Sequence, residues 1–197
     1  MATGGNGRDA GHRLAVTDGP SSERHLKLLP SPPLPGLGVG EVVVYASHGI
    51  GQVVSTRPAG AEPETITLGF ASGLTVILPI ARALTVLRPL SSAADLDDVG
   101  RTLRAVVIAP DETPSRRSRR TREKVASGQA VELAEVVRDG RRREQLHGKG
   151  ASGALAPGDR EVYLHARALL IAEIALSRRI ELAEAEAWML DQIESPP

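Results

Sequence analysis

The sequence predicts an α+β protein with a small β domain followed by an all-helical domain. Short runs of β-branched and aromatic residues, separated by glycine-rich turns, fill residues 38–90. From residue 91 onward, apolar residues recur instead at the three- and four-residue spacing of amphipathic helices. A length of 197 residues is enough for two such domains with modest cores. A β half followed by a purely helical half indicates two separate domains, 38–90 and 91–197.

Residues 1–37 are predicted to form a disordered extension rich in proline and glycine. Apolar residues are too sparse in this segment to offset the entropy lost on ordering. A small apolar group, Leu26, Leu28 and Leu29, precedes a proline-rich stretch. The alternative is therefore a short docking segment that becomes ordered on a partner.

The β domain is organised around residues 40–54, GEVVVYASHGIGQVV. We expect two strands, 42–45 and 51–54, joined at a corner that contains Ser47, His48 and Gly49. Further strands are expected at residues 65–68, 74–78 and 84–87. Pro79 cannot donate a ladder hydrogen bond, so it ends its strand or lies at a sheet edge. Closely spaced short strands favour a small barrel or a strongly bent sheet.

The helical half begins with Ser91 or Ser92, either of which can cap a helix that has Asp95 in its first turn. A second helix is expected to follow the basic stretch and to end at Gly128, a natural C-terminal cap. The next helix contains Gly140, which weakens it by about 1 kcal/mol relative to alanine. A long helix from about Pro157 and a last amphipathic helix over residues 182–193 complete this half.

Composition argues against several classes of protein. The chain has no cysteine, which excludes thiolate metal sites and thiol catalysis and fits an intracellular protein. No apolar run approaches the length of about 20 residues that spans a bilayer. The histidines make no metal-ligand spacing, and His48 is interpreted as ordering its corner. Phosphate-binding loops and nucleophile elbows are absent from the sequence, so neither an enzyme nor a cofactor is predicted.

The net charge is zero, yet residues 115–124 (SRRSRRTREK) are strongly basic. Such a run can be only a solvated helix face. The alternative is contact with nucleic-acid phosphates, which release counterions when arginine neutralises them.

Two sets of motifs resemble CarD-like transcription regulators. In the β half these are residues 40–51, with the order glycine, acid, valines, tyrosine and His-Gly-x-Gly, and Leu-Thr-Val-x-x-Pro at residues 74–79. They resemble the RNA-polymerase-interaction module that the family shares with the transcription-repair coupling factor. In the helical half the matching segments are SRR (115–117), EKVASG (123–128), AEVVRD (134–139), ARALL (166–170) and EIAL (173–176). With both sets in the family's order, the chain from about Gly40 onward is identified as a member.

The resemblance implies a Tudor-like bent β-barrel that binds the RNA polymerase β subunit, followed by a helical bundle. The bundle would contact promoter DNA at the upstream edge of the melting bubble and modulate open-complex stability. Contact would be to the backbone and minor groove, without sequence specificity. The protein would act as a cytoplasmic monomer, associated with the bacterial nucleoid through RNA polymerase.

The resemblance also implies functional residues. The DNA-binding candidates are Arg116, Arg117, Arg119, Arg120, Arg138 and Arg142, and the polymerase-binding candidates are Val54, Arg57, Ile66 and Ile77. At the fork-wedge position, where the family has tryptophan before Ser-Arg-Arg, this chain has Pro114. The only tryptophan, Trp188, falls in the last helix, where we expect it to pack in the core. The alternative function is therefore a polymerase-bound protein-protein adaptor without fork-wedging activity.

Overall fold

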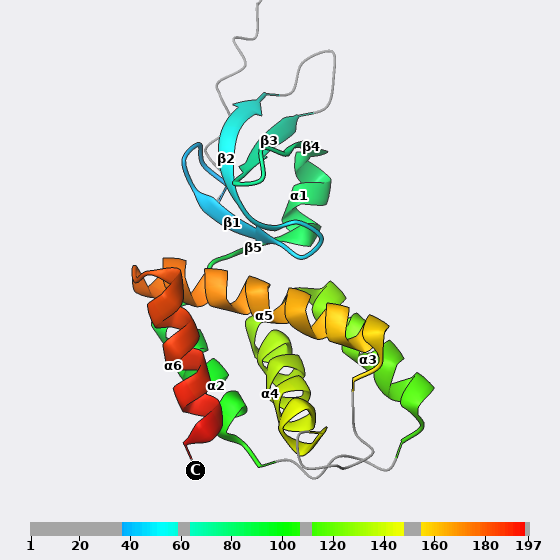
Figure 1. The fold of residues 1–197 in the computed structure, drawn as a ribbon. Coiled ribbons are helices and arrows are strands. Elements are labelled where there is room, and N and C mark those ends of the chain that lie inside the picture. Colours follow the sequence, from blue (N-terminus) through cyan, green and yellow to red (C-terminus); the bar gives the residue numbers. More distant parts are fainter. Residues whose placement is uncertain (1–36, 59–63, 107–111, 148–154, 196–197) are drawn as a thin grey trace, which may run out of the picture. The chain divides into compact units, whose positions relative to one another are not determined.

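The computed structural model describes residues 37–58, 64–106, 112–147 and 155–195 (Figure 1). An antiparallel sheet with one short helix comes first, and five helices follow, which confirms the predicted fold class. The predicted disordered extension lies outside the described residues, except for Leu37, which is buried in the sheet core. Among the described residues no helix is both long enough and apolar enough to cross a membrane.

The sheet contains five antiparallel strands in the order β4-β3-β2-β1-β5. Their bounds are β1 Val42–Tyr45, β2 Gly49–Arg57, β3 Thr65–Phe70, β4 Thr75–Pro79 and β5 Leu87–Pro89. Strands β1 and β2 form the predicted hairpin, in which Tyr45 pairs with Gly49. Gly49 has a φ of +83°, a conformation that glycine adopts without steric cost. Pro79 is the last residue of β4, an outer strand of the sheet, as its missing N–H requires.

Alternate residues of the strands face a small, mainly aliphatic core. This core contains Val43, Val53, Ile66, Leu68, Phe70, Leu78 and Ala83. A β-bulge interrupts the pairing of β2 with β3 between Val53 and Ser55. Val54 directly follows the buried Val53, so it points away from the core and is 55% exposed.

The strand predicted at residues 84–87 is wrong. Residues Ile80–Val86 form helix α1, and only Leu87 enters a strand, β5. The segment Ala81-Arg82-Ala83-Leu84 consists of good helix formers, and a helix buries Ala83 completely while Leu84 remains exposed. The β-branched residues Thr85 and Val86 suggested a strand, but burial of Ala83 favours the helix.

Five helices follow the sheet, and they bury one continuous apolar cluster. They are α2 Ala93–Arg104, α3 Pro114–Ser127, α4 Ala130–His147, α5 Pro157–Arg178 and α6 Leu182–Glu194. The longest, α5, contacts α2, α3, α4 and α6 (orange in Figure 1). The predicted caps are confirmed: the Ser92 side chain caps α2 through a capping box with Asp95, and Gly128 ends α3 at a φ of +67°.

Gly140 lies inside α4, as predicted, and a neighbouring helix explains why it is glycine. A Cβ atom at this position would lie 2.3 Å from Cδ2 of Tyr163, a buried residue of α5. Atoms cannot approach so closely, so a side chain here would push α4 away from α5. The loss of helix propensity at Gly140 is thus linked to close packing of the two helices.

Candidate nucleic-acid interface

Helix α3 is the most basic element of the described structure. Six of its residues are arginine or lysine and one is acidic. Thr113 is the N-cap and accepts a hydrogen bond at 3.4 Å from the backbone N–H of Arg116, while Pro114 occupies the first turn. The basic stretch therefore lies within the helix and does not precede it. Its arginines divide between a solvent-facing side and a side that faces α4.

Three arginines at three-residue spacing, Arg116, Arg119 and Arg122, are exposed, and we call them the arginine face. Arg119 forms an ion pair with Glu123 at 2.8 Å, and both side chains are largely exposed, so the pair is weak. In the described part of the chain, the side chains of Arg116 and Arg122 make no hydrogen bond or ion pair. Arg122 was not among the predicted DNA-binding residues, although its spacing from Arg116 and Arg119 could have identified it.

Arg117 and Arg120, also predicted to bind DNA, are half-buried beside Glu112. The Glu112 Oε1 atom lies 2.7 Å from Arg120 Nη2 and 3.8 Å from Arg117 Nε. The contact with Arg120 is an ion pair whose angles are too poor for a hydrogen bond. Arg117 also donates to the backbone carbonyl of Glu112 at 3.1 Å. These two arginines are therefore partly neutralised and less available to an external phosphate than the arginine face.

The other two predicted DNA-binding arginines lie on α4 and bind the end of α2. Arg138 is 4% exposed; it donates to the Thr102 carbonyl at 3.1 Å and to Asp139 Oδ1 at 2.9 Å. Arg142 donates to the Ala105 carbonyl at 2.8 Å. The last carbonyls of a helix have no partner within it, and arginine is a favourable donor to them. The structure thus gives both residues a role in joining α4 to α2.

Pro114 and Trp188 occupy very different environments. Pro114 is exposed at the first position of α3. Trp188 is half-buried against the helical core, and the guanidinium carbon of Arg178 lies 4.1 Å from its ring centroid. Its packing against the core agrees with the prediction for Trp188.

The predicted polymerase-binding residues do not all share one face of the sheet. Ile77 of β4 is 57% exposed and pairs with Thr67 of β3, on the face opposite the core. Gly69 lies two residues after Thr67 and therefore on the same face of the sheet. A Cβ added at Gly69 would lie 2.9 Å from Cγ2 of Val54, so Val54 lies on this face as well. Ile66 is completely buried on the other face, and Arg57 is exposed at the end of β2. Val54 and Ile77 therefore form an outer apolar face beside the edge strand β4.

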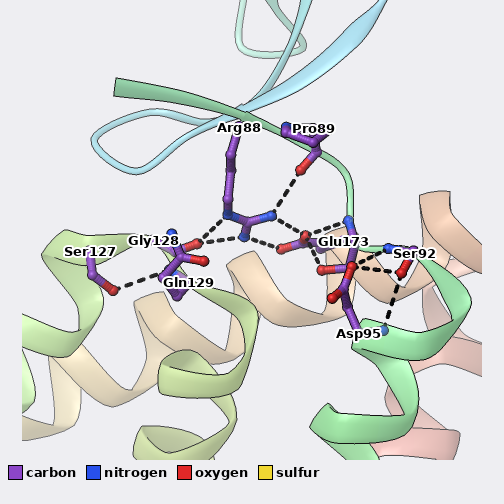
Figure 2. A network of polar contacts seen from close by, with 9 residues as sticks. Arg88, Pro89, Ser92, Asp95, Ser127, Gly128, Gln129 and Glu173 are labelled. Atoms are coloured by element: carbon purple, nitrogen blue, oxygen red, sulfur yellow. Dashed lines mark hydrogen bonds and ion pairs between the residues drawn. The ribbon is translucent and has the colours of Figure 1, made fainter. Parts of the chain in front are cut away.

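An ion pair between Arg88 of β5 and Glu173 of α5 joins the sheet to the helices (Figure 2). Arg88 Nη1 and Nη2 donate to the two carboxylate oxygens at 2.5 and 2.7 Å. Ser91 donates to the same carboxylate through its backbone N–H and its hydroxyl, at 3.1 and 2.7 Å. Arg88 Nε also donates to the Gly128 carbonyl at 2.9 Å. Glu173 is 1% exposed, so these partners take the place of water around its carboxylate.

Two glycines allow close packing around this ion pair. A Cβ at Gly128 would lie 2.6 Å from the Cβ of Ala46, in the turn between β1 and β2. A Cβ at Gly49 would lie 3.1 Å from Leu169 of α5. The Ser-Gly motif at the end of α3 thus serves three purposes: it ends the helix, approaches the sheet and presents a carbonyl to Arg88. Neither Arg88 nor Glu173 was identified from the sequence, where each resembles an ordinary surface charge.

The described residues contain no group of three or more His, Cys, Asp or Glu side chains that could hold a metal ion. His48 is exposed, and its ring makes T-shaped contacts with Tyr45 and Phe70, with centroids 5.1 and 5.7 Å away. Its backbone N–H donates to the Tyr45 carbonyl at 2.9 Å. These contacts agree with the interpretation that His48 orders the corner of the hairpin.

Comparison with protein families gives two matches that follow each other along the chain. Residues 37–91 match the CarD-like/TRCF RID domain, and residues 98–190 match the C-terminal domain of CarD. The first match covers the sheet with α1, and the second covers the helices from within α2 to within α6. The ranges agree with the two regions in which the sequence motifs occur.

Proposed function

Because this chain belongs to the CarD-like family of RNA polymerase-associated transcription regulators, we propose that it binds polymerase and promoter DNA at once. Residues 38–90 form the domain that binds the polymerase β subunit, and residues 91–197 form the domain that contacts DNA. The complex changes the lifetime of the open promoter complex. The observation that carries the proposal is the arginine face of α3, where exposed cations gather on one side of one helix.

The arginine face is suited to DNA backbone and not to base sequence. Arginine binds phosphate oxygens through charge-assisted hydrogen bonds, and such contacts position a protein on the duplex. Arg116 and Arg122 need not break an ion pair with any described residue in order to bind a phosphate. Arg138 is excluded from this surface by its burial, and Arg142, Arg117 and Arg120 contribute through the local potential.

The outer apolar face of the sheet is suited to a protein partner. Val54 and Ile77 are both more than half exposed, and β4 has a strand neighbour on one side only within the described sheet. An outer strand with free backbone groups can accept a further strand, and exposed side chains beside it provide specificity. Ile66 supports this surface from the core and does not touch the partner.

The Arg88–Glu173 ion pair allows the two contacts to reinforce each other. When two weak binding sites are joined with restricted freedom, the second contact forms at a high effective concentration. The ion pair and its hydrogen bonds to Ser91 and Gly128 connect β5, α5 and the turn after α3. A polymerase-bound sheet would therefore hold α3 near the upstream DNA.

Regulators of this family act by binding, and we infer no catalytic activity for this chain. We place it as a monomer in the bacterial cytoplasm, at the nucleoid with RNA polymerase.

The adaptor function is favoured by one observation, the presence of Pro114 at the start of α3. Proline is used as a wedge between base pairs by some minor-groove proteins, but its ring has little surface to stack on a base. A chain without a wedge could bind polymerase, and other proteins through it, without stabilising the fork.

The lifetime of open complexes on a promoter distinguishes the two functions. Purified polymerase is assayed with the natural chain, with Pro114→Trp and with Arg116→Ala/Arg122→Ala. We expect the natural chain to lengthen the lifetime, because arginine contacts keep the protein on the fork. The arginine variant should lose most of this effect. If only Pro114→Trp lengthens the lifetime, the chain binds polymerase without wedging and the adaptor function is correct.

Polymerase binding is tested separately with a matched pair of variants. Ile77→Lys places a charge on the outer apolar face, whereas Leu84→Lys places the same charge on α1 at nearly equal exposure, 54% against 57%. We expect Ile77→Lys to weaken binding to the β subunit at least about tenfold, because burying an unpaired charge is costly. Leu84→Lys should bind normally. Equal affinities would place the contact elsewhere.

A further inference from the structure

A cavity of about 530 Å³ lies among α3, α4 and α5, on the side of α3 that faces α4. Its apolar wall includes Val136, Leu155 and the ring of Tyr163. The rest of the lining is highly charged. Pockets that bind small molecules have volumes of about 300–1,000 Å³ and combine apolar walls with a few polar groups. The volume of this cavity is within that range, but its lining is far more charged than is usual for such a pocket, which favours a charged ligand.

The charges that line the cavity do not balance. Six are cationic and four are acidic: Arg117, Arg120, Lys124, Arg138, Arg142 and Arg143 against Glu112, Glu135, Asp139 and Asp159. Glu112 serves both Arg117 and Arg120, Glu135 pairs with Lys124, and Asp139 pairs with Arg138. The cavity therefore has an excess of positive charge.

Among the described residues, no acidic group forms an ion pair with Arg142 or Arg143. Arg142 donates to a neutral acceptor, the Ala105 carbonyl, at 2.8 Å. Arg143 is half-buried and makes no hydrogen bond or ion pair to any described residue. Burial lowers the pKa of Arg143, and the neighbouring charge of Arg117 lowers it further, despite the opposing effect of Asp139, Asp159 and Glu112. A half-buried arginine without an acceptor is costly, and an anion would remove that cost.

We propose that this cavity binds a small phosphorylated ligand, with its phosphate on Arg143 and Arg142 and its organic part against Val136 and Tyr163. Such a site is distinct from the arginine face, because the three exposed arginines of that face do not line the cavity. The excess positive charge suits one or two phosphate groups. The volume leaves room for a group of about the size of a nucleoside beside them.

Isothermal titration calorimetry on the full chain provides the test, with pyrophosphate and a nucleoside diphosphate as probes at constant ionic strength. We expect saturable binding at one site, and tighter binding of the nucleoside diphosphate. Arg143→Gln should weaken binding at least about tenfold, because a hydrogen bond to a charged group is lost. Arg82→Gln removes an exposed charge from α1, outside the cavity, and should have no effect.

Asp159→Asn gives a result that misfolding cannot imitate. Asp159 lines the cavity without an ion pair to any described residue, so its carboxylate opposes an anion there. Removing its charge should tighten pyrophosphate binding several-fold. The proposal fails if neither probe binds saturably, or if Arg143→Gln binds as well as the natural chain. It also fails if forked DNA displaces the probe and Arg143→Gln weakens binding of the DNA as much as binding of the probe. The cavity would then be part of the DNA contact.

Discussion

Gly140 shows that a single residue can be fixed by a contact that the sequence does not reveal. In the sequence it is only a weak point in a helix, because glycine costs about 1 kcal/mol relative to alanine. In the structure the ring of Tyr163 occupies the space that a Cβ would need, at 2.3 Å. The two effects have opposite signs, so their balance can be measured.

We expect Gly140→Ala to destabilise the protein by about 1–3 kcal/mol, because overpacking exceeds the gain in helix propensity. Urea denaturation measures the change. Gly100→Ala in α2 is the matched control: its Cβ would lie 3.2 Å from Oε1 of Gln192, the end of a flexible side chain. That variant should be neutral or more stable by up to about 1 kcal/mol. Equal stabilities for the two variants would contradict the steric role of Tyr163.

Asp95 gives a prediction that depends on pH. The side-chain hydroxyl and then the backbone N–H of Ser92 donate to its carboxylate, both at 2.7 Å, and hold the pKa of Asp95 below its usual value of 3.8. Because the folded-state pKa is depressed, the stabilisation is present above about pH 4 and is lost as the pH falls through the folded-state pKa.

Asp95→Asn should therefore be less stable than the natural chain near neutral pH, and the difference should shrink as the pH falls below about 4 and through the folded-state pKa. Thermal unfolding across this range measures it. Asp97→Asn, an exposed change in the same helix, leaves the capping box intact and should keep the acid dependence of the natural chain. A constant difference between Asp95→Asn and the natural chain would show that the charged cap does not contribute.

At the scale of secondary-structure elements, the contact between β5 and α5 depends mainly on one ion pair, Arg88–Glu173. Arg88→Met leaves the Glu173 carboxylate buried and without its cation, so we expect a loss of about 3–5 kcal/mol in the free energy of unfolding. The double variant Arg88→Met/Glu173→Met should lose less than the sum of the two single changes, because no unpaired charge remains. Urea denaturation of the four proteins completes the cycle.

The exposed pair Arg101–Asp98 in α2 is the control for this cycle. Its side chains are largely in solvent, so the same substitutions there should show a coupling of about 0–1 kcal/mol. A coupling at Arg88–Glu173 as small as at this surface pair would mean that the buried ion pair does not join the two elements.

The sequence predicts elements well where a local pattern decides them. The hairpin, the strands before Pro79, the Ser92 cap and the Gly128 cap all follow from nearby residues, and the structure confirms them. Helix α1 was missed because Thr85 and Val86 favour a strand, whereas burial of Ala83 depends on the sheet.

The roles of the site residues are harder to predict, because the exposure and contacts of each residue depend on partners that are distant in the sequence. Arg116 and Arg138 are both arginines within helical motifs, yet one is exposed and the other donates to a carbonyl of α2. Nothing near Arg138 in the sequence indicates the end of α2, and nothing near Glu173 indicates Arg88. The bulge at Val54 likewise follows from how β2 pairs with β3. Spacing could have identified Arg122, whereas the partners of the buried charges required the fold.

In the whole molecule, the distribution of charge matters more than its sum. Arginine and lysine equal aspartate and glutamate in number, so a neutral chain has no long-range attraction to DNA as a whole. Helix α3 alone carries six cations and one acid. DNA binding should therefore depend on this helix. The salt dependence of DNA binding should then report the number of phosphates that the helix contacts.

Binding of a fork-junction duplex, followed by fluorescence anisotropy across a range of salt concentrations, tests this dependence. Each arginine on a phosphate contributes about 0.9 to the slope of log K against log salt, so Arg116→Gln/Arg122→Gln should reduce the slope by about 1.8. The double variant Arg82→Gln/Arg101→Gln removes the same charge from exposed positions on α1 and α2 and should leave the slope unchanged. If both variants reduce the slope equally, DNA senses the total charge of the chain and α3 has no special role. If only the first does, the arginine face is the part of this neutral protein that meets the DNA backbone.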